Sequence, residues 1–191
     1  MSPSTPSRRL LATLGICALV LTACGGSGNT VAAPASASAS ATPSAPPVCP
    51  TKAPVEVDPP AGSTTDLSAK PVVAPASAPP PTELQYADIV VGDGAEAVTG
   101  SQVEVKYVGA LYESGTEFDS SWSRGVDETI PFGICRAGVI PGFAVGPTGM
   151  KVGGRRMITI PSELGYKEAG QPPVIPGGAT LVFVVDLVEV K

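Results

Sequence analysis

Histidine is absent from this chain of 191 residues, and its absence excludes several kinds of chemistry. Without an imidazole, neither a Ser-His-Asp nor a Cys-His catalytic arrangement can form, and metal sites built on histidine ligands are excluded. Basic residues are in the minority, since 12 lysines and arginines stand against 17 aspartates and glutamates, for a formal net charge of -5. An acidic surface repels phosphate backbones, so we expect no nucleic acid partner, and we expect no metal or cofactor. We interpret the nearest basic cluster, Lys151, Arg155 and Arg156, as a solvated loop and strand start.

Aromatic residues are scarce, and all of them lie at or after Tyr86. The chain has four tyrosines, four phenylalanines and one tryptophan, whereas most of its 22 prolines precede Thr82. A segment rich in alanine, serine and proline, without aromatics, buries too little apolar area to offset the entropy lost on ordering. We therefore expect residues 24–82 to form a disordered, flexible tether and residues 83–191 to form one folded domain. Two interruptions, Val55–Asp58 and Asp66–Val73, could instead add a short strand or pad, although a flexible linker is the favoured interpretation.

No apolar run is long enough to cross a bilayer as an ordinary helix. The longest, Leu10–Leu21, follows two arginines and leads into the small residues Thr22 and Ala23 and then Cys24. This order is typical of a signal peptide, here residues 1–23, and it resembles a bacterial lipobox whose Cys24 receives the lipid. The sequence thus predicts a protein on the extracytoplasmic face of the cell membrane, anchored through Cys24.

Four cysteines are present. Cys17 lies in the predicted signal peptide and Cys24 in the lipobox, which leaves Cys49 and Cys135 in an oxidising compartment where disulfides persist. The two could form a bridge that joins the tether to the domain. Free thiols or an intermolecular bond remain open, because a bridge requires the two Cα atoms to come within about 7 Å.

Alternation of apolar and polar residues predicts strands throughout the folded part. Residues 103–111 place Val103, Val105 and Tyr107 on one face, and further extended segments are expected at 84–91, 118–120, 130–132, 156–160 and 180–190. A single short helix is predicted after Ile140, because Pro141 suits a first helical turn and is followed by apolar residues and a glycine. The sum is an α+β fold, with an antiparallel sheet of about five strands wrapped around one short helix.

Six short blocks resemble, in order and approximate spacing, the FK506-binding protein (FKBP) family of peptidyl-prolyl cis-trans isomerases. They are Tyr107–Gly109, Phe118–Ser121, Val139–Phe143, Gly149–Gly153, Ile160–Tyr166 and Ile175–Phe183. The resemblance covers residues 84–191. It implies an FKBP-like fold, proline-containing polypeptides as substrates, and a pocket that can take ligands of the FK506 or rapamycin type.

The resemblance also implies residue roles. Four side chains would act on the reacting amide: Tyr107, Phe118, Asp119 and Tyr166. Six would bind the substrate: Phe132, Val139, Ile140, Phe143, Ile175 and Phe183. Phe143 stands where many members have tryptophan. Departures from the family pattern are Ile130 where an aromatic is common, Lys167 where a glycine is usual, and the segment Gly125–Thr129, which is about two residues longer than typical. These departures concern substrate preference and rate more than the fold.

The chemistry of the residues agrees with that implied function. Rotating an X-Pro bond requires no nucleophile, because its barrier of about 18 to 20 kcal/mol comes from amide resonance. A twisted amide has lost that resonance and is less polar, so a dry pocket favours it over the planar ground state. We expect a monomer that speeds this rotation in exported proteins and assists their folding outside the cytoplasmic membrane. The alternative is a chaperone-like module that holds proline segments without turnover.

Overall fold

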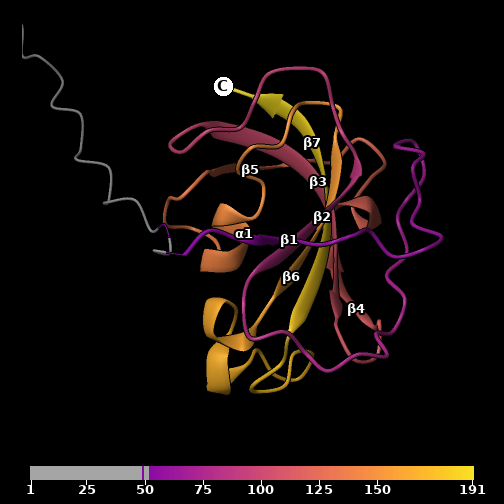
Figure 1. The fold of residues 1–191 in the computed structure, drawn as a ribbon, viewed down its shortest axis with the longest axis vertical. Helices are drawn as coiled ribbons and strands as arrows, with labels where there is room; N and C mark the ends of the chain where they lie inside the picture. The colour runs from indigo at the N-terminus through magenta and orange to yellow at the C-terminus, as the bar shows by residue number, and fades with distance from the viewer. Residues whose placement is uncertain (1–48, 50–51) are drawn as a thin grey trace, which may run out of the picture. The chain divides into compact units, whose positions relative to one another are not determined.

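The computed structural model describes Cys49 and residues 52–191 (Figure 1). The predicted signal peptide, the lipobox at Cys24 and the first part of the predicted tether lie outside the described residues. Within the described residues, no helix is both long enough and apolar enough to cross a membrane.

A sheet of seven strands forms the framework, in the order β1-β2-β6-β7-β3-β4, with β5 paired to β3. The strands are β1 (Val55–Glu56), β2 (Gln85–Val90), β3 (Gln102–Leu111), β4 (Glu117–Ser120), β5 (Ile130–Gly133), β6 (Arg155–Ile160) and β7 (Leu181–Val190). All pairings are antiparallel except that of β1 with β2. The predicted α+β architecture is confirmed, and the sheet is wider than expected partly because β1 adds an edge strand.

One short α-helix, α1 (Pro141–Val145), packs against one face of the sheet, as the sequence predicts. Pro141 occupies its first turn, and Gly142, Phe143, Ala144 and Val145 are buried. The described part of the chain also contains three short 3-10 turns: η1 (Ser121–Ser123), η2 (Ser162–Leu164) and η3 (Lys167–Ala169). The central strand β7 is buried from Leu181 to Leu187, which is consistent with a sheet that is covered on both faces.

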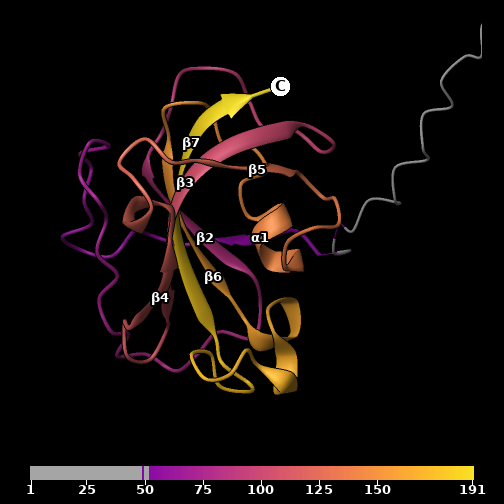
Figure 2. The ribbon, with the colours of Figure 1, turned by 180° about the vertical axis from the view of Figure 1, so that it is seen from behind.

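The second face is covered by residues 52–82, which we call the strap. Figures 1 and 2 show the part of the strap that follows β1, in purple, on the side of the sheet away from α1. The strap pairs with β2 through β1, and its Ala76 amide donates to the Tyr112 carbonyl at 3.0 Å. For residues 52–82, the expected flexible tether is therefore not what the structure shows. Backbone groups of the strap form these bonds, so its lack of aromatic residues does not prevent it from ordering.

Arg155 provides the main attachment of the strap. It donates through Nε and Nη2 to the Asp186 carboxylate at 2.5 and 2.7 Å, and both side chains are almost fully buried. Its other N–H groups donate to three strap carbonyls, those of Thr64, Asp66 and Ala69, at 2.9 to 3.1 Å. All five guanidinium donors are thus satisfied.

Arg156 points to the opposite face, as the next residue of a strand does. It pairs with Asp88 at 2.7 and 2.9 Å and donates to the carbonyls of Gly146 and Thr148 at the end of α1. The interpretation of Arg155 and Arg156 as solvated is wrong, since both are buried. Each has the hydrogen-bonded partners that a buried charge requires.

Cys49 and Cys135 form a disulfide, with their Cα atoms 4.8 Å apart. Cys135 is buried beside α1, and its amide donates to the Ala144 carbonyl at 3.0 Å. The bridge fixes the chain just before the strap to the loop between β5 and α1.

Candidate functional site

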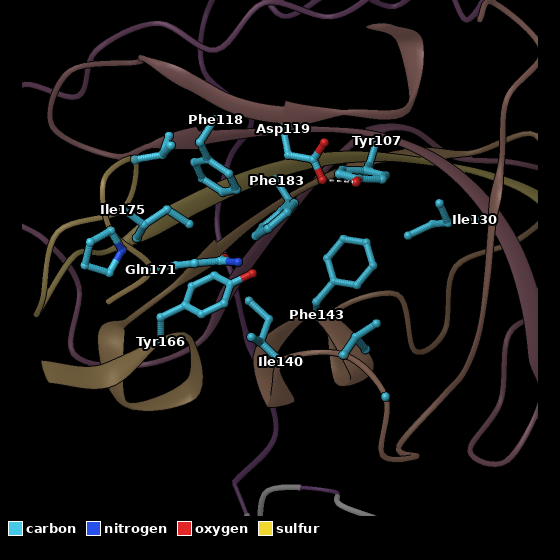
Figure 3. Close-up of a pocket in the computed structure, with 14 residues that line it drawn as sticks. Tyr107, Phe118, Asp119, Ile130, Ile140, Phe143, Tyr166, Gln171, Ile175 and Phe183 are labelled. Atoms are coloured by element: carbon cyan, nitrogen blue, oxygen red, sulfur yellow. Dashed lines mark hydrogen bonds between the residues drawn. The ribbon is translucent and has the colours of Figure 1, made fainter. Parts of the chain in front are cut away.

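A pocket of about 440 Å³ opens between α1, β3, β4, β7 and the loop that contains η3 (Figure 3). Its lining is mostly apolar and aromatic, with a few polar groups, which is the usual make-up of a small-ligand site. The lining residues are Tyr107, Phe118, Asp119, Ile130, Gly138, Val139, Ile140, Phe143, Tyr166, Gln171, Pro172, Val174, Ile175 and Phe183.

Phe143 forms the floor of the pocket. It projects from α1, with only 3% of its surface exposed. Its ring lies 4.8 Å from Phe183 and 5.7 Å from Tyr107, both in edge-to-face arrangements. Such pairs hold ring orientations with an energy of about 0.5 to 1.5 kcal/mol beyond their burial. The floor is therefore already formed without a ligand.

Gly109 allows the wall to form. Phe118 and Phe183 meet edge to face, with centroids 5.5 Å apart. A Cβ atom at Gly109 would lie 2.8 Å from ring atoms of both phenylalanines. Only the absence of a side chain on β3 lets the two rings close over the strand.

The polar side of the pocket is a three-residue network around Asp119. The Tyr107 hydroxyl donates to Oδ2 of Asp119. Arg124 donates to Oδ1 of Asp119 at 2.8 Å and to the Tyr107 hydroxyl oxygen at 3.0 Å, while the Ser120 amide donates to Oδ1 at 2.8 Å. Asp119 is thus fixed in position with both oxygens occupied.

This network keeps the carboxylate charged and the phenol neutral. Burial opposes the charged form of Asp119, but the hydrogen bonds from Tyr107, Arg124 and the Ser120 amide outweigh it and lower its pKa below 3.8. Burial, together with the hydrogen bond to Asp119, raises the pKa of Tyr107. Burial and the Asp119 charge also raise the pKa of Tyr166. Both hydroxyls therefore keep their protons at neutral pH.

Nine of the ten residues predicted for catalysis and substrate binding line this pocket. The exception is Phe132, which lies behind the floor with its ring 5.0 Å from that of Phe143. Phe132 is 7% exposed and belongs to the core, because its strand β5 turns this side chain inward against α1. The predicted lipidation site, Cys24, lies outside the described residues.

Sequence reasoning missed five lining residues: Ile130, Gly138, Gln171, Pro172 and Val174. The sequence marks Ile130 only as a departure from the family pattern. Gly138 and Val174 each directly precede a matched block, whereas Gln171 and Pro172 lie between blocks, so no motif marks them. The edges of the blocks could therefore have indicated Gly138 and Val174, but not Gln171 or Pro172.

The pocket suits a ligand with an apolar ring that carries polar groups at its edge. Among the described residues, no group of three or more His, Cys, Asp or Glu side chains could hold a metal ion. Asp119 and Tyr107 approach the centre of the pocket from one side and Tyr166 and Gln171 from the other, with the phenylalanine rings between them (Figure 3).

Comparison with known proteins matches the sequence to one family. A family model described as FKBP-type peptidyl-prolyl cis-trans isomerase matches residues 94–188. A probable FK506-binding protein of Corynebacterium glutamicum is 47% identical over 120 residues, which cover 63% of this chain and 98% of the relative. A peptidyl-prolyl cis-trans isomerase of Saccharomyces cerevisiae is 51% identical over 96 residues, covering 50% of this chain and 70% of the relative.

A solved structure has a similar fold. The crystal structure of FkpA from Escherichia coli superimposes with a TM-score of 0.51 and 39% identity over 62% of this chain. The match spans 51% of the FkpA chain, about half its length.

Proposed function

This chain belongs to the FKBP-type peptidyl-prolyl cis-trans isomerases, and from that premise we propose that its pocket speeds X-Pro rotation in exported polypeptides. The observation that carries the proposal is the buried floor of Phe143, enclosed by Tyr107 and Phe183 within 6.0 Å. A prolyl ring seated on this floor leaves water behind. The planar amide, which is the more polar form, loses more hydration than the twisted one, so the barrier falls.

Opposite sides of the pocket have different roles in the rotation. Asp119, held by Tyr107 and Arg124, presents a fixed negative charge beside the rotating bond. Tyr166 stands opposite and keeps its proton, since its pKa is raised. Its hydroxyl donates a hydrogen bond to the carbonyl of residue X, the residue before proline, and so holds that carbonyl while the prolyl side turns.

The test is a protease-coupled assay on a series of X-Pro tetrapeptides, with FK506 as the competing ligand. We expect acceleration that FK506 abolishes, and loss of acceleration in the Phe143→Ala variant if circular dichroism shows that the variant is folded. FK506 binding without acceleration would replace the enzyme with the second candidate, a module that holds proline segments. Neither binding nor acceleration would overturn both.

We propose the surface of the cytoplasmic membrane as the site of action, with export directed by residues 1–23 and a lipid on Cys24. The Cys49–Cys135 disulfide supports an oxidising compartment, because cytosolic thiols are normally kept reduced. Intact mass of the membrane-extracted protein tests this directly. The expected species starts at Cys24 and carries lipid, and Cys24→Ser should release the protein from the membrane fraction. An unprocessed, unlipidated chain would overturn the proposal.

A further inference from the structure

Two polar groups in the pocket have no hydrogen-bond partner among residues 52–191. They are the Tyr166 hydroxyl and the side-chain amide of Gln171, both of which line the pocket. The Asp119 carboxylate differs, because Tyr107, Arg124 and the Ser120 amide already occupy it. Hydrogen-bonding capacity that is free for a ligand is therefore concentrated on the Tyr166 side.

The backbone of Gln171 is fixed even though its side chain is exposed. Its amide donates to the Ile175 carbonyl at 2.8 Å, and the Ile175 amide donates back to the Gln171 carbonyl at 3.0 Å. Upstream, the Gly170 amide donates to the Tyr166 carbonyl at 3.1 Å. Buried Ile175 anchors this loop, so both side chains project into the pocket from a common rigid base.

A peptide that enters the pocket loses bound water on the Tyr166 side. If Tyr166 binds the carbonyl of residue X, then the N–H of residue X lies roughly one residue length away, about 3.5 Å along an extended chain. That N–H needs an acceptor when the peptide displaces water, because a donor left without one weakens binding. Among lining side chains on this side, the Gln171 Oε1 atom is the available acceptor.

We propose that Gln171 accepts a hydrogen bond from the N–H of residue X, which makes it a specificity-determining residue. This inference rests on the proposed function and refines it. The pocket selects substrates whose residue X has a free N–H, and it disfavours a proline at X, as in Pro-Pro segments. The contact adds to substrate positioning and takes no part in the amide rotation itself.

The experiment pairs a protein change with a substrate change. Two otherwise identical tetrapeptides are compared by NMR exchange, one with a normal amide at residue X and one with an ester oxygen replacing that N–H. We expect Gln171→Leu to lower kcat/KM for the amide substrate about 3- to 10-fold, in line with a net hydrogen bond of about 1 kcal/mol. The ester substrate should respond less than twofold. Gln171→Glu retains an acceptor and should retain the preference for the amide substrate.

Gln102→Leu is the matched control, because Gln102 is an exposed glutamine at the start of β3, outside the pocket. It should leave both rates unchanged. Equal losses on both substrates in Gln171→Leu, no loss on either, or loss of the preference in Gln171→Glu would overturn the inference. A wild-type protein inactive on both substrates would overturn the proposed function instead, so the two failures are distinguishable.

Discussion

Asp119 illustrates how a single carboxylate can be kept charged in a half-apolar site. Burial alone would raise its pKa, yet three donors reverse the sign. The same donors leave its oxygens no freedom to rotate. The same contacts therefore set both its charge and its position. A sequence motif implies these contacts only collectively, without showing which residue bonds to which.

Replacing Asp119 with asparagine should lower kcat/KM about tenfold at pH 7, because the neutral amide removes the fixed negative charge beside the rotating bond and weakens the hydrogen bonds that Tyr107 and Arg124 donate. The stability effect should depend on pH. The folded pKa lies below the ordinary value of 3.8, so the stabilisation by Asp119 is complete above 3.8 and is lost as pH falls through the folded value. Urea unfolding at pH 7, 5, 3 and 2 measures it. A difference between wild type and variant that changes between pH 7 and 5 would contradict this assignment.

Phe132 and Phe143 are neighbours with different roles. Phe132→Leu should lower the free energy of unfolding by about 1 to 2 kcal/mol, because it leaves a small cavity, with KM unchanged within about twofold. Phe143→Leu should cost similar stability but raise KM, because it reshapes the pocket floor. Chemical denaturation and steady-state kinetics on the two variants check the contrast. A larger KM change in Phe132→Leu would return that residue to the binding surface.

Among the elements, α1 owes its position to two glycines that face β6. A Cβ atom at Gly142 would lie 2.4 Å from Cγ2 of Ile160, and one at Gly146 would lie 2.5 Å from Cδ1 of Ile158. The helix can therefore approach the sheet closely enough to place Phe143 under the pocket. Five residues suffice for this helix because packing, rather than helix propensity, stabilises it.

The Gly142→Ala variant tests helix propensity against close packing of α1 on β6. Helix propensity favours alanine by about 1 kcal/mol, whereas overpacking against Ile160 costs about 1 to 3 kcal/mol. We expect net destabilisation and a lower kcat/KM, as α1 moves away with Phe143. Thermal unfolding and the isomerase assay measure both. A stabilised variant would show that the helix can shift without cost.

The elements that the sequence predicts well are those whose pattern is local. The alternation of β3, the Pro141 start of α1 and the pocket residues within matched blocks all follow from short stretches. Gln171 lies between blocks, and its position depends on a loop closed by Ile175. Phe132 is predicted to bind the substrate but lies in the core. An apolar residue at strand spacing does not reveal whether it faces the core or a ligand.

For the molecule as a whole, the strap could not be predicted from composition. Its order depends on partners far away in sequence, namely β2, Arg155 and the Cys49–Cys135 bridge. Arg155 itself suggested a solvated surface, since nothing local shows that Asp186 and three strap carbonyls surround it. The family match starts at residue 94, so the whole strap lies outside it.

Arg155 should therefore stabilise the whole fold through its ion pair with Asp186 and order the strap through hydrogen bonds to its carbonyls. Arg155→Met leaves the Asp186 carboxylate buried without its partner, which costs about 3 to 5 kcal/mol. Changing both, as Arg155→Met with Asp186→Leu, should recover much of that loss, because removing a buried pair together is far cheaper. The strap carbonyls lose their donor in either case, so both variants should be cut within residues 60–82 by a nonspecific protease.

Urea unfolding and mass spectrometry of the protease fragments separate these two effects. Stability should differ between the single and the double variant, whereas strap cleavage should rise in both. The pocket lies across the sheet, so kcat/KM of the folded double variant should stay within about threefold of wild type, a smaller effect than the tenfold expected at Asp119. A strap that resists cleavage in both variants would mean that β1 and the disulfide hold it without Arg155.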